Sequence, residues 1–241
     1  MTPRLLRPSG SGCFVFLCDH ASNHVPGELA ALGLPAAELE RHIAWDIGAA
    51  GVTEALSEAF DAPAILSSNS RLVIDCNRQL TAPDLIPELS DATMIPGNRQ
   101  LIAPEKVHRI ERWFRPYHDA VELVLLERAA RGVESIVVSI HSMTPILAGV
   151  ARPWQIALSS YRDRSLADPV LAALRAPGDV TVGDNEPYDL DPAVDYSIPF
   201  HALRRGWRHL QVEFRQDEVA CTATQLQWAG RLASALRSCI P

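Results

Sequence analysis

The chain has 241 residues, 47% of them hydrophobic, which is enough to bury a sizeable core without disulfides or a structural metal ion. Its formal net charge is −7 and it contains no basic block, so a nucleic-acid partner is not expected. No apolar run reaches ~18 residues and the N-terminus lacks a signal-peptide hydrophobic region, so we expect a cytoplasmic protein that makes no membrane contact.

Seven short apolar runs, several of them β-branched, predict strands. They cover residues 13–18, 64–66, 71–75, 135–140, 155–159, 179–182 and 209–214. Helical patterns separate most of them: 47–60, 222–238, and a long stretch over 104–131 that Pro116 is expected to interrupt and Gly132 to end. This alternation predicts a three-layer α/β/α fold with a mostly parallel mixed sheet. Because no linker divides the chain, we expect one domain over residues 1–241.

Two segments between these elements, 81–103 and 183–199, are rich in Pro, Asp and Asn and predict long loops. Loops of that length within a domain usually act as lids or binding loops. The five cysteines form no C-x-x-C pair, and Cys13, Cys18 and Cys76 lie in apolar runs, so we expect reduced and buried thiols.

Two predicted strands deliver a histidine at their C-terminal ends. His20 follows the strand at 13–18, and His141 follows the strand at 135–140. In open α/β sheets, ligands and catalytic groups lie at that edge. Paired histidines there predict a metal site, and zinc is the common ion for histidine ligands. Each of the other six histidines is, by itself, more often structural than a ligand.

Asp46 lies four residues after His42 and just before the helix predicted over 47–60. Its carboxylate could bind the same metal ion or hold one of the ligands in place. It could equally cap the N-terminus of the helix, which is a common position for aspartate. The local sequence leaves both interpretations open.

The strand at 209–214 continues into polar residues. Period-two alternation puts Gln211, Glu213 and Arg215 on one face of this strand. A central parallel strand is normally apolar on both faces, so this polar face predicts a cleft. The alternative is an edge strand that carries a Glu–Arg ion pair.

A second polar cluster flanks the run at 71–75, with Arg71 at its start and Asn77 and Arg78 just after it. The planar guanidinium of arginine suits bidentate binding of a carboxylate. The alternative is a solvated strand end in which Arg78 pairs with Asp75 or Asp84.

Other reaction classes lack their motifs. There is no G-x-S-x-G sequence, so a serine hydrolase of that type is not favoured. The glycine-rich motifs G-x-G-x-x-G and G-x-x-x-x-G-K-[ST], which bind nucleotides, are also missing. The strand-buried thiols are poor candidates for a cysteine nucleophile.

Five motifs, in order along about residues 13–220, resemble those of the N-formylglutamate amidohydrolase family. They are Cys18-Asp19-His20-Ala21-Ser22-Asn23, Ser70-Arg71 through Asp75-Cys76-Asn77-Arg78, Ser139-Ile140-His141-Ser142-Met143, Gly183-Asp184-Asn185-Glu186-Pro187-Tyr188, and Gln211-Val212-Glu213-Phe214-Arg215-Gln216-Asp217. The resemblance implies the phosphorylase/hydrolase-like fold of the related zinc carboxypeptidases. It also implies zinc-dependent hydrolysis of N-formyl-L-glutamate to formate and L-glutamate, within histidine degradation.

The resemblance implies roles for the matching positions. His20 and His141 would bind zinc, and Glu213 would be the catalytic glutamate. Asn77 and Arg78 would hold a substrate carboxylate. Arg71 would contact the substrate or the developing oxyanion, and either Arg71 or Arg215 would hold a second carboxylate. The expected partner is therefore a small acidic N-acyl amino acid.

One position departs from the H-x-x-E pattern of the carboxypeptidases, because Asn23 stands three residues after His20. A neutral amide is a poor zinc ligand, so either a carboxylate from elsewhere completes the site, with Asp46 as our first choice, or the metal is bound weakly. The departure leaves two alternatives open. The chain could be a zinc hydrolase of another N-acyl amino acid or small peptide, or a non-catalytic ligand-binding protein on the same scaffold. The sequence does not predict the oligomeric state.

Overall fold

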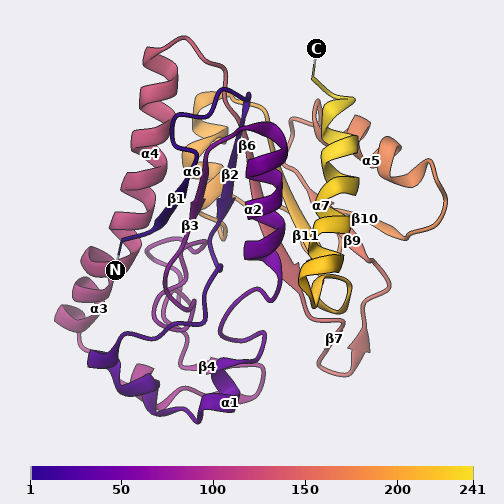
Figure 1. The fold of residues 1–241 in the computed structure, drawn as a ribbon. Coiled ribbons are helices and arrows are strands. Elements are labelled where there is room, and N and C mark those ends of the chain that lie inside the picture. The colour runs from indigo at the N-terminus through magenta and orange to yellow at the C-terminus, as the bar shows by residue number, and fades with distance from the viewer. Residues whose placement is uncertain (1, 241) are drawn as a thin grey trace.

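The fold is built around a seven-stranded sheet in the order β1-β3-β2-β6-β11-β9-β10, in a computed structural model that describes residues 2–240 (Figure 1). Strands β3, β2, β6 and β11 run parallel to one another, β1 pairs antiparallel with β3, and β9 pairs antiparallel with β11. The strands are β1 (Arg4–Leu6), β2 (Phe14–Cys18), β3 (Ala64–Leu66), β6 (Ile136–Met143), β9 (Ile156–Ser159), β10 (Val182–Asp184) and β11 (His209–Arg215). The predicted mostly parallel mixed sheet is confirmed.

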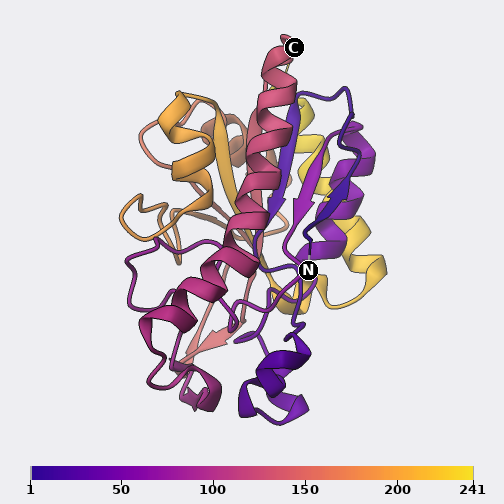
Figure 2. The same ribbon diagram turned by 90° about the vertical axis from the view of Figure 1, so that its left-hand side faces the viewer.

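Helices cover both faces of this sheet, which confirms the three-layer prediction (Figures 1 and 2). One face carries α2 (Ala49–Phe60), α5 (Ala167–Arg175) and α7 (Thr222–Arg237), and the other carries α4 (Arg115–Ala130) and α6 (Ser197–His201). Smaller elements extend the loops: α1 (Ala36–Leu39), α3 (Ala103–Arg109), and the two-stranded pairs β4 (Leu89–Ser90) with β5 (Thr93–Met94) and β7 (Ile146–Leu147) with β8 (Val150–Ala151).

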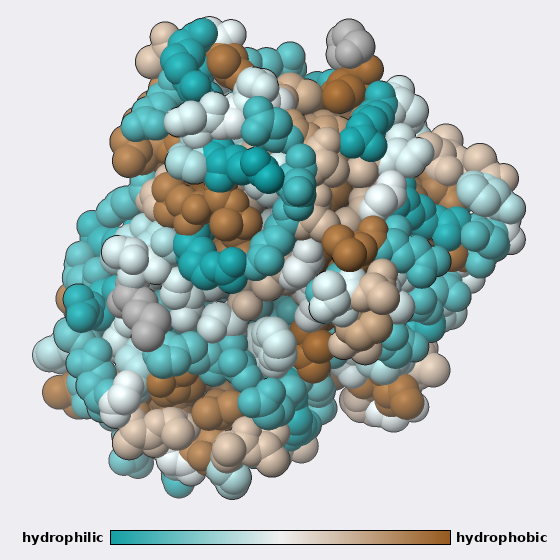
Figure 3. All heavy atoms as spheres, viewed as in Figure 1, coloured by the Kyte–Doolittle hydropathy of each residue, from teal (hydrophilic) through white to brown (hydrophobic). Residues whose placement is uncertain are grey.

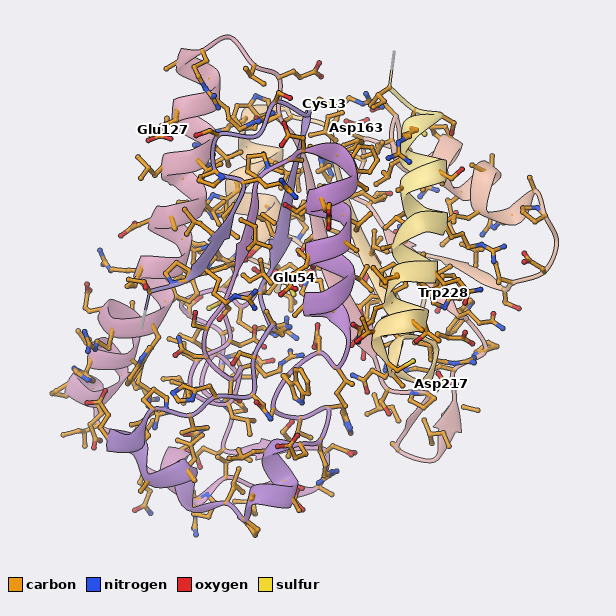
Figure 4. All side chains as sticks on the ribbon, in the orientation of Figure 1. Cys13, Glu54, Glu127, Asp163, Asp217 and Trp228 are labelled. Carbon is orange, nitrogen blue, oxygen red and sulfur yellow. The ribbon has the colours of Figure 1, made fainter. Side chains whose placement is uncertain are left out.

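The core lies on both sides of the central strands. On β2, Phe14 and Phe16 belong to the cluster beneath α2 and α7, whereas Val15 and Leu17 belong to the cluster beneath α4. A strand covered on both faces needs apolar residues at every position, which is why these runs were recognisable in the sequence. Trp228 lies on α7 (Figure 4). Its ring packs edge-on against the Phe214 ring of β11, with the ring centroids 5.9 Å apart.

The long helical stretch predicted over 104–131 is present. The helix continues through Pro116 by way of one wider turn and is not broken there. Proline has no N–H to donate to the carbonyl of Arg112, four residues before it. The chain accommodates this with a π-helical turn at Ile110–Phe114 between α3 and α4. Gly132, with φ of +70°, ends the stretch in the left-handed region, as expected for a residue just past a helix.

The prediction of a strand over residues 71–75 is wrong. Residues 71–73 form a turn in which the Val73 N–H donates to the Ser70 carbonyl, and residues 74 and 75 are irregular, with the Asp75 N–H donating to the Leu85 carbonyl of another loop. Their apolar side chains are buried under loops and under the π-helical turn that precedes α4, so the predicted burial is correct and the predicted strand is not. The strand expected over 179–182 lies at 182–184. The loops expected over 81–103 and 183–199 also contain the β4–β5 hairpin and α6.

On the face in Figure 3, hydrophobic residues gather in several separate clusters among polar ones. Within residues 2–240, every helix falls short of the length and hydrophobicity needed to cross a bilayer.

Candidate active site

His20, Asp46 and His141 converge at the carboxyl edge of the parallel strands. His20 stands two residues after β2, and His141 lies within β6, which extends to Met143. Asp46 is held beside them because its N–H donates to the His20 carbonyl at 3.0 Å. One ligand atom from each residue lies within 4.8 Å of the other two, and all three side chains are buried, so the group could hold a metal ion.

Both imidazoles present the same nitrogen to Asp46. The Nδ1 atoms of His20 and His141 lie 3.2 and 2.9 Å from Asp46 Oδ2. On the other side, His20 Nε2 lies 2.7 Å from Asp75 Oδ1, and His141 Nε2 lies 3.2 Å from Asp19 Oδ2. A carboxylate that holds the far nitrogen fixes the tautomer and the ring orientation, which is the usual arrangement of metal-binding histidines.

Three buried carboxylates surround the two rings and set their charge. Burial by itself lowers the pKa of His141, but hydrogen bonds with Asp19 and Asp46 outweigh it and raise that pKa well above its ordinary value. Burial would raise the pKa of Asp46, yet the charge of His20 and the hydrogen bond with His141 lower it strongly. The site therefore concentrates negative charge, which favours cations, including divalent metal ions.

Glu213 lies opposite His141, since β11 and β6 are parallel and these residues share one level of the register. Burial raises the pKa of Glu213 to about 7, with Asp46 acting in the same direction and His141 opposing it. A carboxyl group that titrates near neutrality can accept a proton and return it, which general acid–base catalysis requires.

A cavity of about 320 Å³ connects these groups, within the size range of small-molecule sites. Its lining contains most of the residues singled out in the sequence, together with some that were not: His20, His42, Asp46, Arg71, Asn77, Arg78, His141, Arg152, Tyr188, Gln211, Glu213 and Gln216 among others. The polar face of β11 therefore opens onto a cleft, and the edge-strand alternative is wrong.

Arg71, Asn77 and Arg78, the polar residues that flank the run at 71–75, have different surroundings in the structure. Arg71 donates to Asp75 Oδ2 at 2.6 and 3.1 Å and reaches Asp46 Oδ1 at 3.4 Å, so its guanidinium stands beside the histidine pair. Arg78 lines the cavity while its Nε donates to Asp84 Oδ2 at 3.0 Å. The Arg78–Asp84 ion pair that the sequence offered as an alternative is therefore present, and Arg78 still lines the cavity.

Asn77 is buried, and its side chain holds the segment before α6. Its Oδ1 accepts hydrogen bonds from the Tyr196 and Ser197 N–H groups at 3.1 and 2.9 Å. Its Nδ2 donates to Asp195 Oδ1 at 3.2 Å. The structure therefore engages all the polar atoms of Asn77 in fastening the 195–197 segment to the cavity wall.

Arg215, one of the two arginines expected to hold a second substrate carboxylate, does not line the cavity. Its guanidinium donates to Asp217 at 2.7 Å and Glu218 at 3.0 Å, and to the carbonyl of Arg152 at 3.2 Å. The chain leaves β11 after Arg215 for a 3₁₀ turn at Gln216–Val219, and that turn brings the acidic partners beside the guanidinium. Asp217 lies at this end of β11 (Figure 4).

The position that departs from H-x-x-E is structural here. Asn23 Nδ2 donates to the Leu39 carbonyl at 3.0 Å, and the residue is not part of the cavity lining. The helix-cap interpretation of Asp46 is wrong, since α2 begins after Gly48 without a side-chain cap. Asp46 is instead the carboxylate beside both histidines.

Sequence reasoning missed Arg152, Asp19 and Asp75 as parts of the site. Asp19 and Asp75 each stand in a motif that was recognised, next to His20 and Asn77, and this proximity was an available signal. Arg152 follows the β7–β8 hairpin in a stretch without a motif, so no local pattern identified it.

Comparisons with known proteins show the family and the fold. The family model described as N-formylglutamate amidohydrolase matches residues 12–220. The crystal structure of a gene product from Agrobacterium tumefaciens is similar with a TM-score of 0.95 and 35% identity, over 99% of this chain and 94% of that one. An N-formylglutamate amidohydrolase from Ralstonia eutropha shares the fold, with a TM-score of 0.72 and 20% identity over 99% of this chain and 97% of its own. Comparison with curated proteins gave no match.

Proposed function

Since this chain belongs to the N-formylglutamate amidohydrolase family, we propose that it is a metal-dependent enzyme that hydrolyses N-formyl-L-glutamate to formate and L-glutamate. The observation that carries the proposal is the convergence of His20, Asp46 and His141 with Glu213 on one cavity. A ligand-binding protein would not need a buried carboxyl group that titrates near neutrality beside a metal-binding group.

The donor set fits zinc. Two imidazoles and one carboxylate are a common three-ligand set of catalytic zinc sites, whereas structural zinc usually has four ligands with cysteine among them. His20, Asp46 and His141 would hold the ion, with Asp75 and Asp19 fixing the two rings from behind. Bound there, zinc supplies a water of lowered pKa and polarises the formyl oxygen.

Glu213 would carry the proton. It takes a proton from the attacking water as the new carbon–oxygen bond forms at the formyl carbon. It then returns this proton to the amide nitrogen as the carbon–nitrogen bond breaks, so that glutamate leaves as a neutral amine. The buried position of Glu213 keeps bulk water from competing for the proton.

Two arginines support the reaction from the 71–78 segment. Arg78, beside Asn77, would bind a carboxylate of the substrate, because its guanidinium reaches the cavity. Arg71 stands beside the histidine pair, where its charge would stabilise the oxyanion that develops on the formyl group.

The test combines metal analysis with a substrate panel. Protein purified without chelator is expected to contain about one zinc per chain, as a single catalytic site requires. Formate release from N-formyl-L-glutamate is expected to exceed release from N-acetyl and dipeptide substrates. Faster cleavage of N-acetyl or peptide substrates would favour another zinc hydrolase, and no cleavage by zinc-loaded protein would favour the non-catalytic alternative. Cytoplasmic location and a role in histidine degradation stay predictions from the sequence.

A further inference from the structure

Arg152 differs from the other arginines of the cavity in its charge environment. Arg71 pairs with Asp75 and Asp46, and Arg78 pairs with Asp84. Within residues 2–240, no carboxylate forms an ion pair with Arg152, although only 7% of the residue is exposed.

Elsewhere in residues 2–240, two other buried arginines, Arg109 and Arg128, also lack a carboxylate partner, but the side chain of each donates at least three hydrogen bonds of 3.1 Å or less, mostly to carbonyls. Among the described residues the Arg152 side chain has a single hydrogen bond of that length, and it lines the cavity, so an anion bound there would satisfy its remaining donors and its charge.

The guanidinium of Arg152 is nevertheless held in place. Its Nη2 donates to the Tyr188 hydroxyl at 2.5 Å, and its Cζ lies 4.9 Å from the centre of the Tyr188 ring. Its Nη1 is 3.5 Å from the Thr144 carbonyl, and its backbone N–H donates to the Pro145 carbonyl at 2.9 Å. A guanidinium has five N–H donors, so donors remain for a planar anion.

Arg152 and Arg78 are carried by segments that adjoin different strands of the sheet. Arg78 belongs to the segment that follows β3, and Arg152 immediately precedes the region of β9. In the sheet, β3 and β9 lie on opposite sides of the β6–β11 pair that carries His141 and Glu213. The cavity therefore offers two separate cationic groups, with the reactive residues between the strands that deliver them.

We propose that Arg152 binds the side-chain carboxylate of the substrate, with Tyr188 orienting the guanidinium, and so determines specificity for acidic N-acyl amino acids. This inference rests on the proposed function. Arg78 binds the other carboxylate, and the dicarboxylate spans the cavity with its formyl group at Glu213. Arg152 takes the place that the sequence suggested for Arg215, whose guanidinium is neutralised outside the cavity by Asp217 and Glu218.

The first test compares two substrates of nearly equal shape, N-formyl-L-glutamate and N-formyl-L-glutamine. Arg152→Met is expected to lower kcat/KM for the glutamate substrate by roughly 10–100-fold, the value of one charged hydrogen-bonded contact, mostly through KM. The glutamine substrate is expected to change by less than about 3-fold, since its side chain offers no charge to lose. Arg152→Lys should recover part of the loss, because it restores the charge without the planar fork.

A matched control is Arg231→Met on α7, where the guanidinium pairs with Asp179 and does not line the cavity. This variant is expected to cleave both substrates like the unmodified chain. Equal losses for both substrates in Arg152→Met would assign Arg152 a structural role and overturn the proposal. Unchanged kinetics for the glutamate substrate would overturn it as well.

A binding measurement separates this proposal from the proposed function. L-Glutamate and L-glutamine are titrated into the zinc-loaded protein by calorimetry. The unmodified chain is expected to prefer L-glutamate by roughly 10-fold or more, and Arg152→Met is expected to lose that preference. If no N-formyl substrate is cleaved, the proposed function fails, while this preference and its loss still support the role of Arg152. No preference in the unmodified chain would overturn that role.

Discussion

Glu213 on β11 lies directly opposite His141 on β6, at one level of two hydrogen-bonded parallel strands. Neighbouring strands are about 4.8 Å apart, and residues paired in parallel register point to the same face. The backbone ladder therefore sets the separation of the proposed proton carrier and the proposed metal ligand. Because both residues lie within strands of the central sheet, substitutions at this pair can be interpreted chemically.

Glu213→Gln is expected to lower kcat by roughly 10²–10⁴-fold, the usual contribution of a general acid–base group. The amide has the shape of the carboxyl group but cannot accept the proton of water. Zinc content should stay unchanged, since Glu213 is not in the metal-binding group. Glu127→Gln, an exposed residue on α4, is the control. Retained turnover in Glu213→Gln would assign the proton transfer to another residue.

Asp46→Asn is expected to remove most of the zinc from the purified protein. The substitution replaces the carboxylate that faces both Nδ1 atoms with a neutral amide. Changes to residues that only support ligands cost about 10–100-fold in affinity, so loss of a ligand should cost more. Metal content after dialysis, measured by mass spectrometry, checks the prediction.

Asn23→Ala is the matched control for that experiment. It stands at the position where the carboxypeptidase pattern has its ligand, but its amide bonds to the Leu39 carbonyl and not to the metal-binding group. Zinc content should therefore stay at the level of the unmodified chain. Equal zinc loss in both variants would mean that Asp46 acts through the local fold and not as a ligand.

Asn77→Ala is expected to destabilise the fold by about 1–3 kcal/mol, because it leaves the N–H groups of Tyr196 and Ser197 without their acceptor. The KM for N-formyl-L-glutamate should rise as well, since the 195–197 segment forms part of the cavity wall. Urea unfolding and steady-state kinetics measure the two effects. Gln79→Ala should affect KM less, because Gln79 does not line the cavity and the Tyr196 and Ser197 N–H groups keep their acceptor, although donors to the Pro192 and Asp195 carbonyls are lost. Unchanged stability in Asn77→Ala would contradict this account.

The buried pair His118 and His201 should make the fold sensitive to acid. Their rings bond at 3.0 Å between Nδ1 and Nε2, and burial lowers the pKa of His118 to about 4 and that of His201 well below its ordinary value. An unfolded histidine titrates near pH 6.5, so the unfolded chain binds protons that the folded chain excludes. The stability from neutral His118 is thus complete above about pH 6.5 and is lost as the pH falls toward 4.

His118→Gln tests this linkage. Between pH 7 and pH 5, the unmodified chain should lose about 2 kcal/mol more unfolding free energy than the variant, which follows from a shift of that size for one group. Urea unfolding at the two pH values measures the difference. His108→Gln on the exposed side of α3 is the control. A pH dependence that is identical in His118→Gln and the unmodified chain would contradict the prediction.

Much of the sheet and part of the site could be predicted from local patterns. The runs that became β2, β6 and β11 were recognisable because helices cover both faces of these strands, so every position had to be apolar or face the site. Chain direction then placed His20 and His141 at one edge, since parallel strands present their carboxyl ends together. Both predictions, the strands and the shared edge of the two histidines, depend only on strand direction and on the periodicity of residues that are close in sequence.

The choice among similar polar residues depended on the tertiary structure. Asp46 could have been a helix cap, and Arg215 had a better pattern than Arg152. The fold placed Asp46 beside two histidines that are far apart in sequence, paired Arg215 with the acidic turn that follows it, and left Arg152 without a carboxylate partner among residues 2–240. Ion pairing and metal coordination depend on distances of a few ångströms, and the residues involved can be a hundred positions apart in the sequence. A local sequence pattern therefore identifies which side chains can bind a metal or an anion, and long-range packing decides which of them do.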